Sequence, residues 1–520
     1  MASKVSLKRE LNTLLLSAIG IGAVIGSGIF TMPGLIAGTA GPMVIVAIVI
    51  MALVTALYIF ILAELGAKYP KSGAIYYFPL HAFGDLTGFI TGWSFYACCF
   101  IGTAAIIYSF LFYLNHYVPG LAKGLTLTPL GTAVAIGILA VVTFINILGI
   151  KYGAWLNFAF TVAKVIPLIV FIIAAFAVFK PANFHPFNPF GASGLALAIA
   201  WGFWMFVGFE SLVLVGEEVR EAEKTIKKSA LTTILTISII YLLVMISFVG
   251  AINWSGLGLK AKSWGDLANL SAPLADVARA FGNPAVAGLL VLGVCISTAG
   301  CFSDWVLLQG RVIFALARER RFWRALSHIH PKYMTPAKAL IFSSILTAIV
   351  MILIPAFPSV TLLAMITEFI PYGISALALA AIVRSAGKLS LKKMLMTWGA
   401  FVFATFYLYW ACWPWTLTGC IIALSAIPVY LYYAKGEHSI AEEIKKNYWY
   451  IIYLIVIPII SLLGDQNFVY ANFLPIGPLN IIRIPYDMIV LAIFATIIYY
   501  LAYRQGLKHA ATAQASEAVA

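Results

Sequence analysis

Residues 20–30 (Gly-Ile-Gly-Ala-Val-Ile-Gly-Ser-Gly-Ile-Phe) place four glycines and a serine inside the first apolar segment of the chain. Gly26-Ser27-Gly28 predicts a break in the helix near the middle of a membrane. Backbone groups freed by such a break must be buried in protein or line a wet cavity, because lipid cannot hydrogen-bond them. A midplane break is typical of the substrate site of secondary transporters. The alternative is a close-packing site of small residues.

The composition indicates an all-α integral membrane protein. The chain is 62% hydrophobic and 10% charged, with a mean hydropathy of +0.99, which excludes a water-soluble protein of this length. The first apolar segment is too long and too interrupted by glycine for a cleavable signal peptide. Segments long enough to cross roughly 30 Å of hydrocarbon predict about fourteen transmembrane helices, at residues 12–39, 42–66, 86–114, 128–149, 154–179, 193–216, 229–252, 284–316, 337–355, 359–383, 396–411, 415–434, 448–464 and 486–504.

Basic residues are distributed unevenly about these segments. With the N-terminus inside, the termini and the connections on that side carry 26 of the 33 lysines and arginines, and the opposite connections carry six. This positive-inside pattern predicts a multi-pass protein of the cell membrane with both termini in the cytoplasm. It accounts for the net charge of +14 without a nucleic-acid partner. The pattern predicts that the protein is surrounded by membrane lipids, and the sequence indicates no protein partner.

The sequence lacks the clusters of cysteine and histidine and the loop motifs that would indicate a metal site or a catalytic site. Five of the six cysteines fall in apolar segments, Cys412 comes directly after one, and all seven histidines fall in connections or tails, so no metal site is predicted within the membrane. The chain has no phosphate-binding GxxxxGK[ST] loop and no nucleophile elbow. We therefore predict no enzyme activity and no cofactor. An ion or exchange gradient, rather than ATP, is the expected energy source.

A second interrupted segment mirrors the first. Residues 201–210 again combine glycine with apolar residues, and Glu210 places a carboxylate near mid-span. Two broken helices five segments apart predict a five-plus-five inverted repeat. The expected organisation is a cytoplasmic N-terminus (1–11), repeat one with helices one to five (12–180), repeat two with helices six to ten (193–384), accessory helices eleven to fourteen (396–504) and a cytoplasmic C-terminal tail (505–520).

Four ordered motifs resemble the amino acid–polyamine–organocation superfamily. They cover the chain from about residue 10 to 384 and comprise Gly26–Phe30, Glu64–Tyr76, Gly208–Glu210 followed by Glu217-Glu218-Val219, and Arg311–Arg318. Fourteen helices are similar to the cationic amino acid transporter branch. One departure is Glu221-Ala222-Glu223, where the family usually has a proline, in a predicted cytoplasmic loop. The resemblance implies the leucine-transporter-type fold and an α-amino acid as substrate.

The resemblance also implies where that amino acid binds. Its carboxylate is expected at the positive end of the second half of helix one, on the backbone amides of Ser27, Gly28 and Ile29. Its ammonium group is expected on the carbonyls of Val24, Trp204 and Val207. Gly26 and Gly28 would permit the unwound backbone and close approach of the ligand, and Gly208 is also expected among the substrate-binding residues. Trp204 matches the aromatic gate over the substrate, with ordinary packing as the alternative.

Lys164 is the residue expected to couple transport to an ion. It lies about nine residues into helix five, roughly 14 Å deep, where a charged amine is costly and marks function. In sodium-coupled relatives of this fold a sodium ion lies between helices one, five and eight, and proton-coupled members resemble this chain in placing a lysine there. The expected partners are the Gly22 carbonyl and a hydroxyl of Ser297, or less favourably Ser303. The alternative is a static ion pair with a buried carboxylate.

Other polar residues suggest further roles. Glu210 matches a family position linked to proton sensing, with structural hydrogen bonding as the alternative. Glu64 and Asp304 are expected to anchor gates or loops near the cytoplasm, and Glu368 to line the external vestibule or contact a cationic side chain. The expected side-chain pocket is mostly apolar and aromatic, which favours neutral or bulky substrates, and comprises Ser94, Tyr96, Phe100, Phe203 and Tyr372.

These observations predict a secondary active amino acid transporter that is proton-coupled and works by alternating access. Within transport, the alternatives are a sodium-coupled or exchange-type carrier of amino acids or polyamines. A transporter-like nutrient sensor belongs to a different class and would need a soluble signalling domain, but the longest connections are too short for one. The sequence does not identify the amino acid, because backbone groups would hold the ends that all amino acids share.

Overall fold

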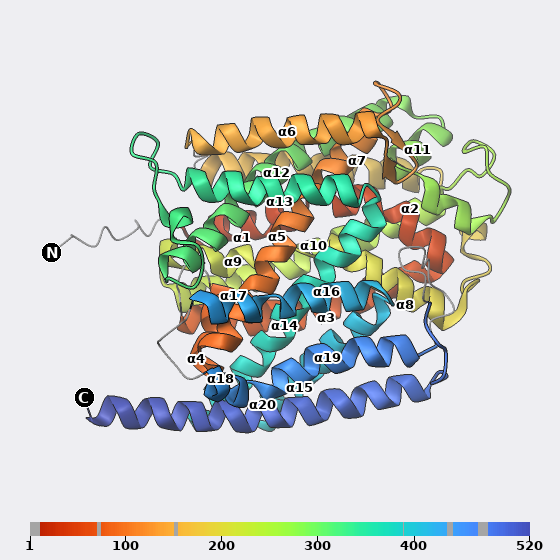
Figure 1. Ribbon diagram of the computed structural model, residues 1–520. Helices are drawn as coiled ribbons and strands as arrows, with labels where there is room; N and C mark the ends of the chain where they lie inside the picture. Colours follow the sequence, from red (N-terminus) through yellow and green to blue (C-terminus); the bar gives the residue numbers. More distant parts are fainter. Residues whose placement is uncertain are drawn as a thin grey trace.

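Apolar segments form long helices, because a helix satisfies its own backbone hydrogen bonds in lipid. The computed structural model describes residues 11–69, 74–149, 154–387, 389–433, 440–465 and 477–519. The predicted N-terminal segment before residue 11, residues 70–73 of the second motif and Ala520 lie outside the described residues. Each of the fourteen predicted segments is helical over most of its described length. The helices form one bundle, in which the chain begins its first helix and ends its last helix at the same end (Figure 1).

The first repeat begins with an interrupted helix. Asn12 caps it, because its side-chain oxygen accepts a hydrogen bond from the amide of Leu15 at 3.0 Å. The helix breaks at residues 25–27 and resumes at Gly28. The elements of this repeat are α1 (Thr13–Val24), α2 (Gly28–Ala40), η1 (Gly41–Met43), α3 (Val44–Lys68), α4 (Ala74–Phe83), α5 (Asp85–Leu114), the hairpin β1 (Ala122–Lys123) and β2 (Thr126–Leu127), α6 (Pro129–Ile147) and α7 (Ala154–Phe176).

The second repeat contains the other interrupted helix, which passes through a 3₁₀ turn and an irregular stretch before it resumes. Its elements, with the turn that precedes them, are η2 (Pro181–Phe184), α8 (Gly191–Gly202), η3 (Phe203–Met205), α9 (Ser211–Leu214), η4 (Gly216–Glu218), α10 (Ala222–Ala251), η5 (Trp264–Asn269), α11 (Pro273–Ala280), α12 (Pro284–Arg318), η6 (Arg324–Ser327), α13 (Ala337–Leu353) and α14 (Phe357–Ser385).

The remaining helices follow the two repeats and lie on one side of the bundle (Figure 1). They are α15 (Leu391–Trp410), α16 (Trp415–Leu424), α17 (Ala426–Tyr433), α18 (Ile440–Lys446), α19 (Tyr448–Leu463) and α20 (Tyr486–Val519). The predicted tail after residue 504 is not a separate segment, because α20 continues as helix through Val519.

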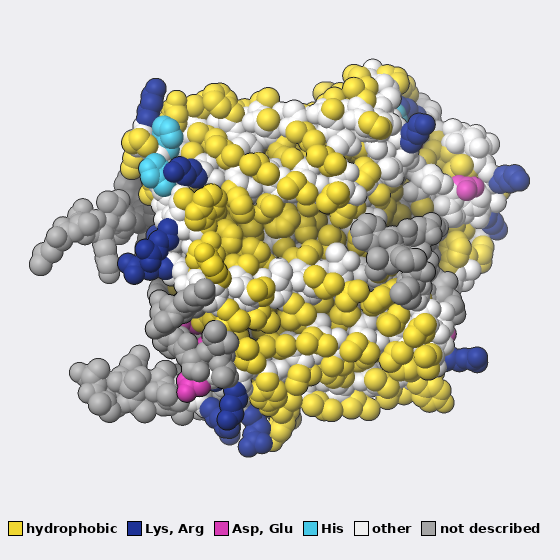
Figure 2. Space-filling model, in the orientation of Figure 1, with side chains coloured by type: hydrophobic (Ala, Val, Ile, Leu, Met, Phe, Trp, Pro, Cys, Tyr) yellow, Lys and Arg dark blue, Asp and Glu magenta, His cyan; other side chains and the backbone are white. Residues whose placement is uncertain are grey.

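Burial separates a central layer from a lipid-facing layer. The apolar stretch of α14 is 100% buried and that of α5 83% buried, whereas those of α6 and α20 are 33% buried. Among the described residues, nine helical stretches are long and apolar enough to cross a membrane, and four shorter apolar helices accompany them. Figure 2 shows the outer surface as a broad apolar band, with lysines and arginines gathered toward the two ends. This is the surface expected of a protein that spans a bilayer.

Candidate functional site

The two helix breaks touch each other through their backbones. A Cβ atom on Gly28 would lie 2.6 Å from the Cα of Met205 and 2.8 Å from the carbonyl oxygen of Trp204. Gly208 has a φ of +117°, and a Cβ there would lie 2.5 Å from the carbonyl oxygen of Ala23. Only glycine fits either position. Both glycines thus permit close approach of the two breaks, a role that the sequence analysis did not predict. Close approach of a ligand to Gly28 stays a prediction.

A cavity lies beside these contacts. Besides backbone of both breaks, its wall includes side chains from α5 and α12. The lining residues are Ala23, Val24, Gly26, Ser27, Gly28, Ile106, Trp204, Val207, Cys301 and Trp305. The amides at the start of α2 have no partner within their helix, so this end of the cavity suits an anionic group.

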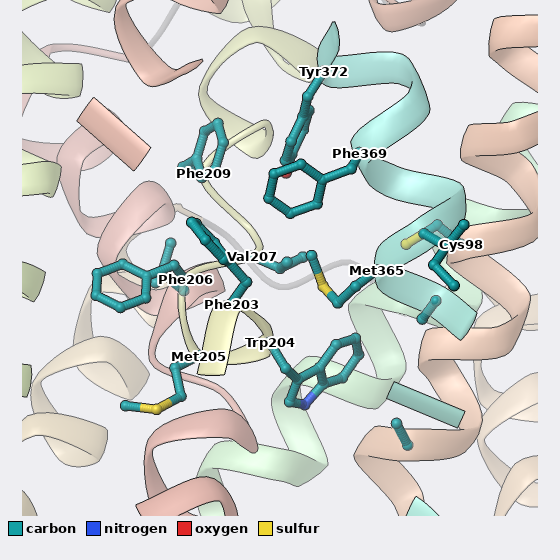
Figure 3. Packing of buried hydrophobic residues seen from close by; sticks show 14 of the residues in the cluster. Cys98, Phe203, Trp204, Met205, Phe206, Val207, Phe209, Met365, Phe369 and Tyr372 are labelled. Atoms are coloured by element: carbon teal, nitrogen blue, oxygen red, sulfur yellow. The ribbon is translucent and has the colours of Figure 1, made fainter. Parts of the chain in front are cut away.

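Six of the nine predicted substrate-binding residues line this cavity, namely Val24, Gly26, Ser27, Gly28, Trp204 and Val207. The other three do not. Ile29 is fully buried, and Gly208 packs on the backbone of helix one. The ring of Phe203 lies 5.0 Å from that of Phe369 and 5.5 Å from that of Tyr407, so it belongs to an aromatic cluster beside the cavity, part of which Figure 3 shows.

The predicted ammonium site has a neighbour that the sequence did not reveal. The Val24 carbonyl already accepts hydrogen bonds from the Tyr241 hydroxyl at 3.0 Å and from the Gly26 amide at 2.8 Å. A carbonyl oxygen has two lone pairs, so a ligand ammonium would have to displace or share one of these donors. The carbonyls of Trp204 and Val207 are therefore better placed in this structure to receive it.

Trp204 closes one side of the cavity. Its indole N–H donates to the Ser27 hydroxyl at 3.0 Å, and its ring lies 5.9 Å from that of Trp305 at a tilt of 53°. Gly102 on α5 makes room for this pair, since a Cβ there would lie 2.4 Å from the Trp305 ring. Trp204 is thus tied to the helix-one break by a hydrogen bond, which plain packing would not require. Its role as a gate stays a prediction.

The Lys164 amine contacts helix one, and one of its predicted partners is different. Its Nζ donates to the Gly22 carbonyl at 2.8 Å and to the Cys301 Sγ at 3.3 Å. The Ser297 hydroxyl instead donates to the Ile25 carbonyl at 3.0 Å, because it lies one turn before Cys301 on α12. The side chain of Lys164 is 4% exposed. The expected hydroxyl partner was therefore wrong, and a thiol takes its place.

A carbonyl and a thiol are thus the direct contacts of Lys164, rather than a carboxylate. Lys164 and Arg311 both act electrostatically on Asp304 of α12. Glu64 forms an ion pair with Lys393 at the start of α15, so it joins repeat one to the accessory helices.

Glu210 lies at the end of the helix-six break and is 3% exposed. Its Oε2 accepts hydrogen bonds from the Gly208 amide and the Tyr372 hydroxyl, both at 3.0 Å. The carboxylate therefore fixes the break to α14, whatever further role it has. Figure 3 shows Tyr372 and Phe209 on this side of the break, with Trp204 on the other.

The predicted side-chain pocket is not where the cavity lies. Ser94 donates to the Thr367 carbonyl at 2.8 Å, and Tyr96 shares a hydrogen bond with Ser343 at 2.9 Å. Phe100 packs on the ring of Tyr96 at 5.3 Å. None of the five predicted residues lines the cavity. They occupy the interior between α5, α13, α14 and the helix-six break.

The sequence analysis missed four lining residues, Ala23, Ile106, Cys301 and Trp305. A signal in the sequence could have found the two on α12, Cys301 and Trp305. They follow Ser297 at intervals of four residues, which places all three on one face of a helix. Ser297 had been assigned to the face of helix eight that meets helix one. Extending that face by two turns would have found the thiol and the indole.

Comparison with known proteins decides the family. A family model described as amino acid permease matches residues 11–464. The chain belongs to the amino acid permease family. This confirms the superfamily resemblance, and with it a membrane transporter rather than an enzyme.

Relatives of known function include several transporters from Bacillus subtilis. The chain is similar to the branched-chain amino acid permease BcaP, with 30% identity over 67% of this chain and 76% of that protein. It is also similar to the aspartate-proton symporter, with 26% identity over 98% and 99% of the two chains. The human cationic amino acid transporter 4 is 26% identical over 67% of this chain and 56% of its own length.

Solved structures support the fold. The chain is similar to a crystal structure of a manganese transporter mutant from Eremococcus coleocola, with a TM-score of 0.52 over 96% of this chain and 99% of that chain. At 13% identity this likeness shows the fold alone. The leucine-transporter-type architecture predicted from the two breaks is thereby confirmed.

Proposed function

We propose that this permease carries a neutral α-amino acid across the cell membrane and couples its movement to protons. The cavity between the two helix breaks carries the proposal, because backbone amides of α2 face one end and backbone of helix six the other. Apart from Ser27, its side chains are apolar, aromatic or thiol, as Ile106, Val207 and Trp305 illustrate. A charged substrate side chain would enter this wall without a counter-charge, which is costly.

Lys164 supports the proton as coupling ion. Its amine lies against the Gly22 carbonyl, one turn of helix one before the break. A lysine in that position supplies the positive charge that a sodium ion would otherwise bring, and a second cation beside it would be repelled. The similarity to an aspartate-proton symporter over almost the whole chain agrees with this ion. The positive-inside pattern supports an orientation with both termini in the cytoplasm.

One uptake assay tests substrate and ion together. The purified protein is reconstituted in proteoliposomes, and uptake of a labelled amino acid is competed with each of the other nineteen at two pH values, in sodium or choline. We expect competition by neutral amino acids, faster uptake at lower external pH, and no change when choline replaces sodium. Competition mainly by arginine, lysine or polyamines would contradict the proposal that the substrate is a neutral amino acid. Strong stimulation of uptake by sodium would contradict the proposal that the coupling ion is a proton.

Substitution of Trp204 tests the gate. In Trp204→Ala the bond to Ser27 and the contact with Trp305 are both lost, so we expect slower uptake with some substrate binding retained. A hydrogen bond of this kind contributes about 0.5–1.5 kcal/mol to the free energy of unfolding, and the variant loses this contribution. Binding is measured by a substrate-induced shift in thermal unfolding, and transport by initial uptake rates.

Trp398→Ala is the matched control, because Trp398 lies on α15, is 36% exposed and bonds to Thr496. Its uptake should equal that of the unmodified protein. If Trp204→Ala also transports at the unmodified rate, Trp204 has a packing role only.

A further inference from the structure

Two glutamates from different elements meet inside the bundle, outside the cavity. Glu210 ends the helix-six break, and Glu368 lies near the middle of α14. They are 3% and 0% exposed. Tyr372, one turn after Glu368 on α14, donates to Glu210, and the charge of Glu210 acts on Glu368. Glu368 does not line the cavity, so the structure does not support its predicted place in an external vestibule or on a substrate side chain.

The two carboxyl groups have different surroundings. Glu210 accepts hydrogen bonds from the Gly208 amide and the Tyr372 hydroxyl, and a carboxyl that accepts two donors is stabilised as the anion. Neither oxygen of Glu368 has a hydrogen-bond partner among the described residues. The Cys98 thiol and the Tyr372 hydroxyl lie beside it, but outside hydrogen-bonding geometry.

No positive side chain balances the pair within the described part of the chain. The groups that act on Glu368 are Glu210, Cys98 and Tyr372, and Cys99 on α5 is also near. The tyrosines that face this region from α3 and α15 are engaged elsewhere. The Tyr58 hydroxyl donates to the Ala400 carbonyl, and the Tyr407 hydroxyl to the Ala200 carbonyl.

Charge balance then requires a positive ion at this site. Two buried carboxylates close together cannot both be ionised without a cation, because desolvation and mutual repulsion act in the same direction. A carboxyl group with no donor to stabilise its negative charge is the one that takes up a proton. We propose that Glu368 holds a proton beside an ionised Glu210, and that this pair is a proton-binding site separate from Lys164.

The position of Tyr372 links this proton to movement of the helix-six break. Tyr372 lies one turn after Glu368 on α14 and binds Glu210 directly. If the break moves away from α14, Glu210 loses this donor and becomes the better proton acceptor of the two. The presence of the proton does not depend on the proposed transport function, but its use in the transport cycle does.

Infrared difference spectroscopy of the full chain in liposomes tests the assignment, because a protonated carboxyl group has a carbonyl stretch that an ionised one lacks. At neutral pH we expect one such band to be lost in Glu368→Gln and retained in Glu210→Gln. Glu223→Gln is the matched control, because Glu223 is an exposed residue of α10 paired with Lys227. The band should also remain in Lys164→Ala.

Three results would overturn the proposal: no protonated carboxyl band changes in Glu368→Gln, a band is lost in Glu210→Gln only, or the band disappears when sodium replaces choline. If Glu368→Gln does not fold, Glu368→Asp is used. The band must then shift in frequency, and an unshifted band counts against Glu368. Since the band is independent of uptake, failure of proton-coupled transport in the assay above would leave this result intact.

Discussion

Replacing Gly28 with alanine should lower the initial rate of uptake roughly 10- to 100-fold, since overpacking of this kind costs about 1–3 kcal/mol. The added carbon would lie 2.6 Å from the Cα of Met205 and 2.8 Å from the carbonyl oxygen of Trp204. Both atoms belong to the backbone, so no side-chain rotation relieves the clash, and the two breaks must separate. Uptake of a labelled neutral amino acid into proteoliposomes, at equal protein content, measures the effect.

Gly137→Ala is the control for this substitution. Gly137 lies within α6, and nothing is within 4 Å of a Cβ placed there, so the same chemical change should leave uptake unaltered. An unmodified uptake rate in Gly28→Ala would show that close contact between the breaks is not needed for transport.

Lys164→Ala should abolish accumulation of substrate against its gradient, while counterflow exchange persists. The substitution removes the only charge that contacts helix one at Gly22 in the described structure, so proton binding there is no longer linked to the helix-one break. The substrate cavity does not include Lys164, so exchange of bound substrate should continue. Accumulation driven by an imposed pH gradient, and exchange in its absence, are measured on the same proteoliposomes.

Lys227→Ala provides the comparison, because Lys227 is an exposed lysine of α10 that pairs with Glu223 at 3.1 Å. It should accumulate substrate normally. If Lys164→Ala still accumulates substrate in response to the pH gradient, the coupling proton binds elsewhere, and Glu210 becomes the first candidate.

The sequence predicted those features that depend on apolar length and on glycine. The two breaks and the helices around them follow from where Gly26, Gly28 and Gly208 interrupt apolar runs, and the six predicted cavity residues follow from the family resemblance. Contacts between distant helices were harder to predict. The Lys164 amine was expected near helix eight, but Ser297 and Cys301 lie on the same face of α12. The choice between them depends on how far α12 is shifted along its axis relative to Lys164, and hydropathy does not determine that shift.

The side-chain pocket could not be located for a similar reason. Ser94, Tyr96 and Phe100 lie on α5, whose apolar stretch is largely buried, so no face of it is distinguished by polarity. The residue of α5 that reaches the cavity is Ile106, which looks like any other aliphatic residue in the sequence. Its selection depends on the depth at which α5 crosses the breaks, and that depth is set by packing against α12 and α14.

The two breaks touch at two separate points of the backbone. Gly28 lies against residues 204–205 at one point, and Gly208 lies against residues 23–24 at the other. A rigid segment that is held at two points can still rotate, but only about the line that joins those points. The half-helices α1 and α9 on one side of this line, and α2 and α8 on the other, can therefore tilt without the breaks sliding past each other. This line can act as a hinge axis, and it passes beside the cavity that opens alternately to the two sides of the membrane in the proposed transport cycle.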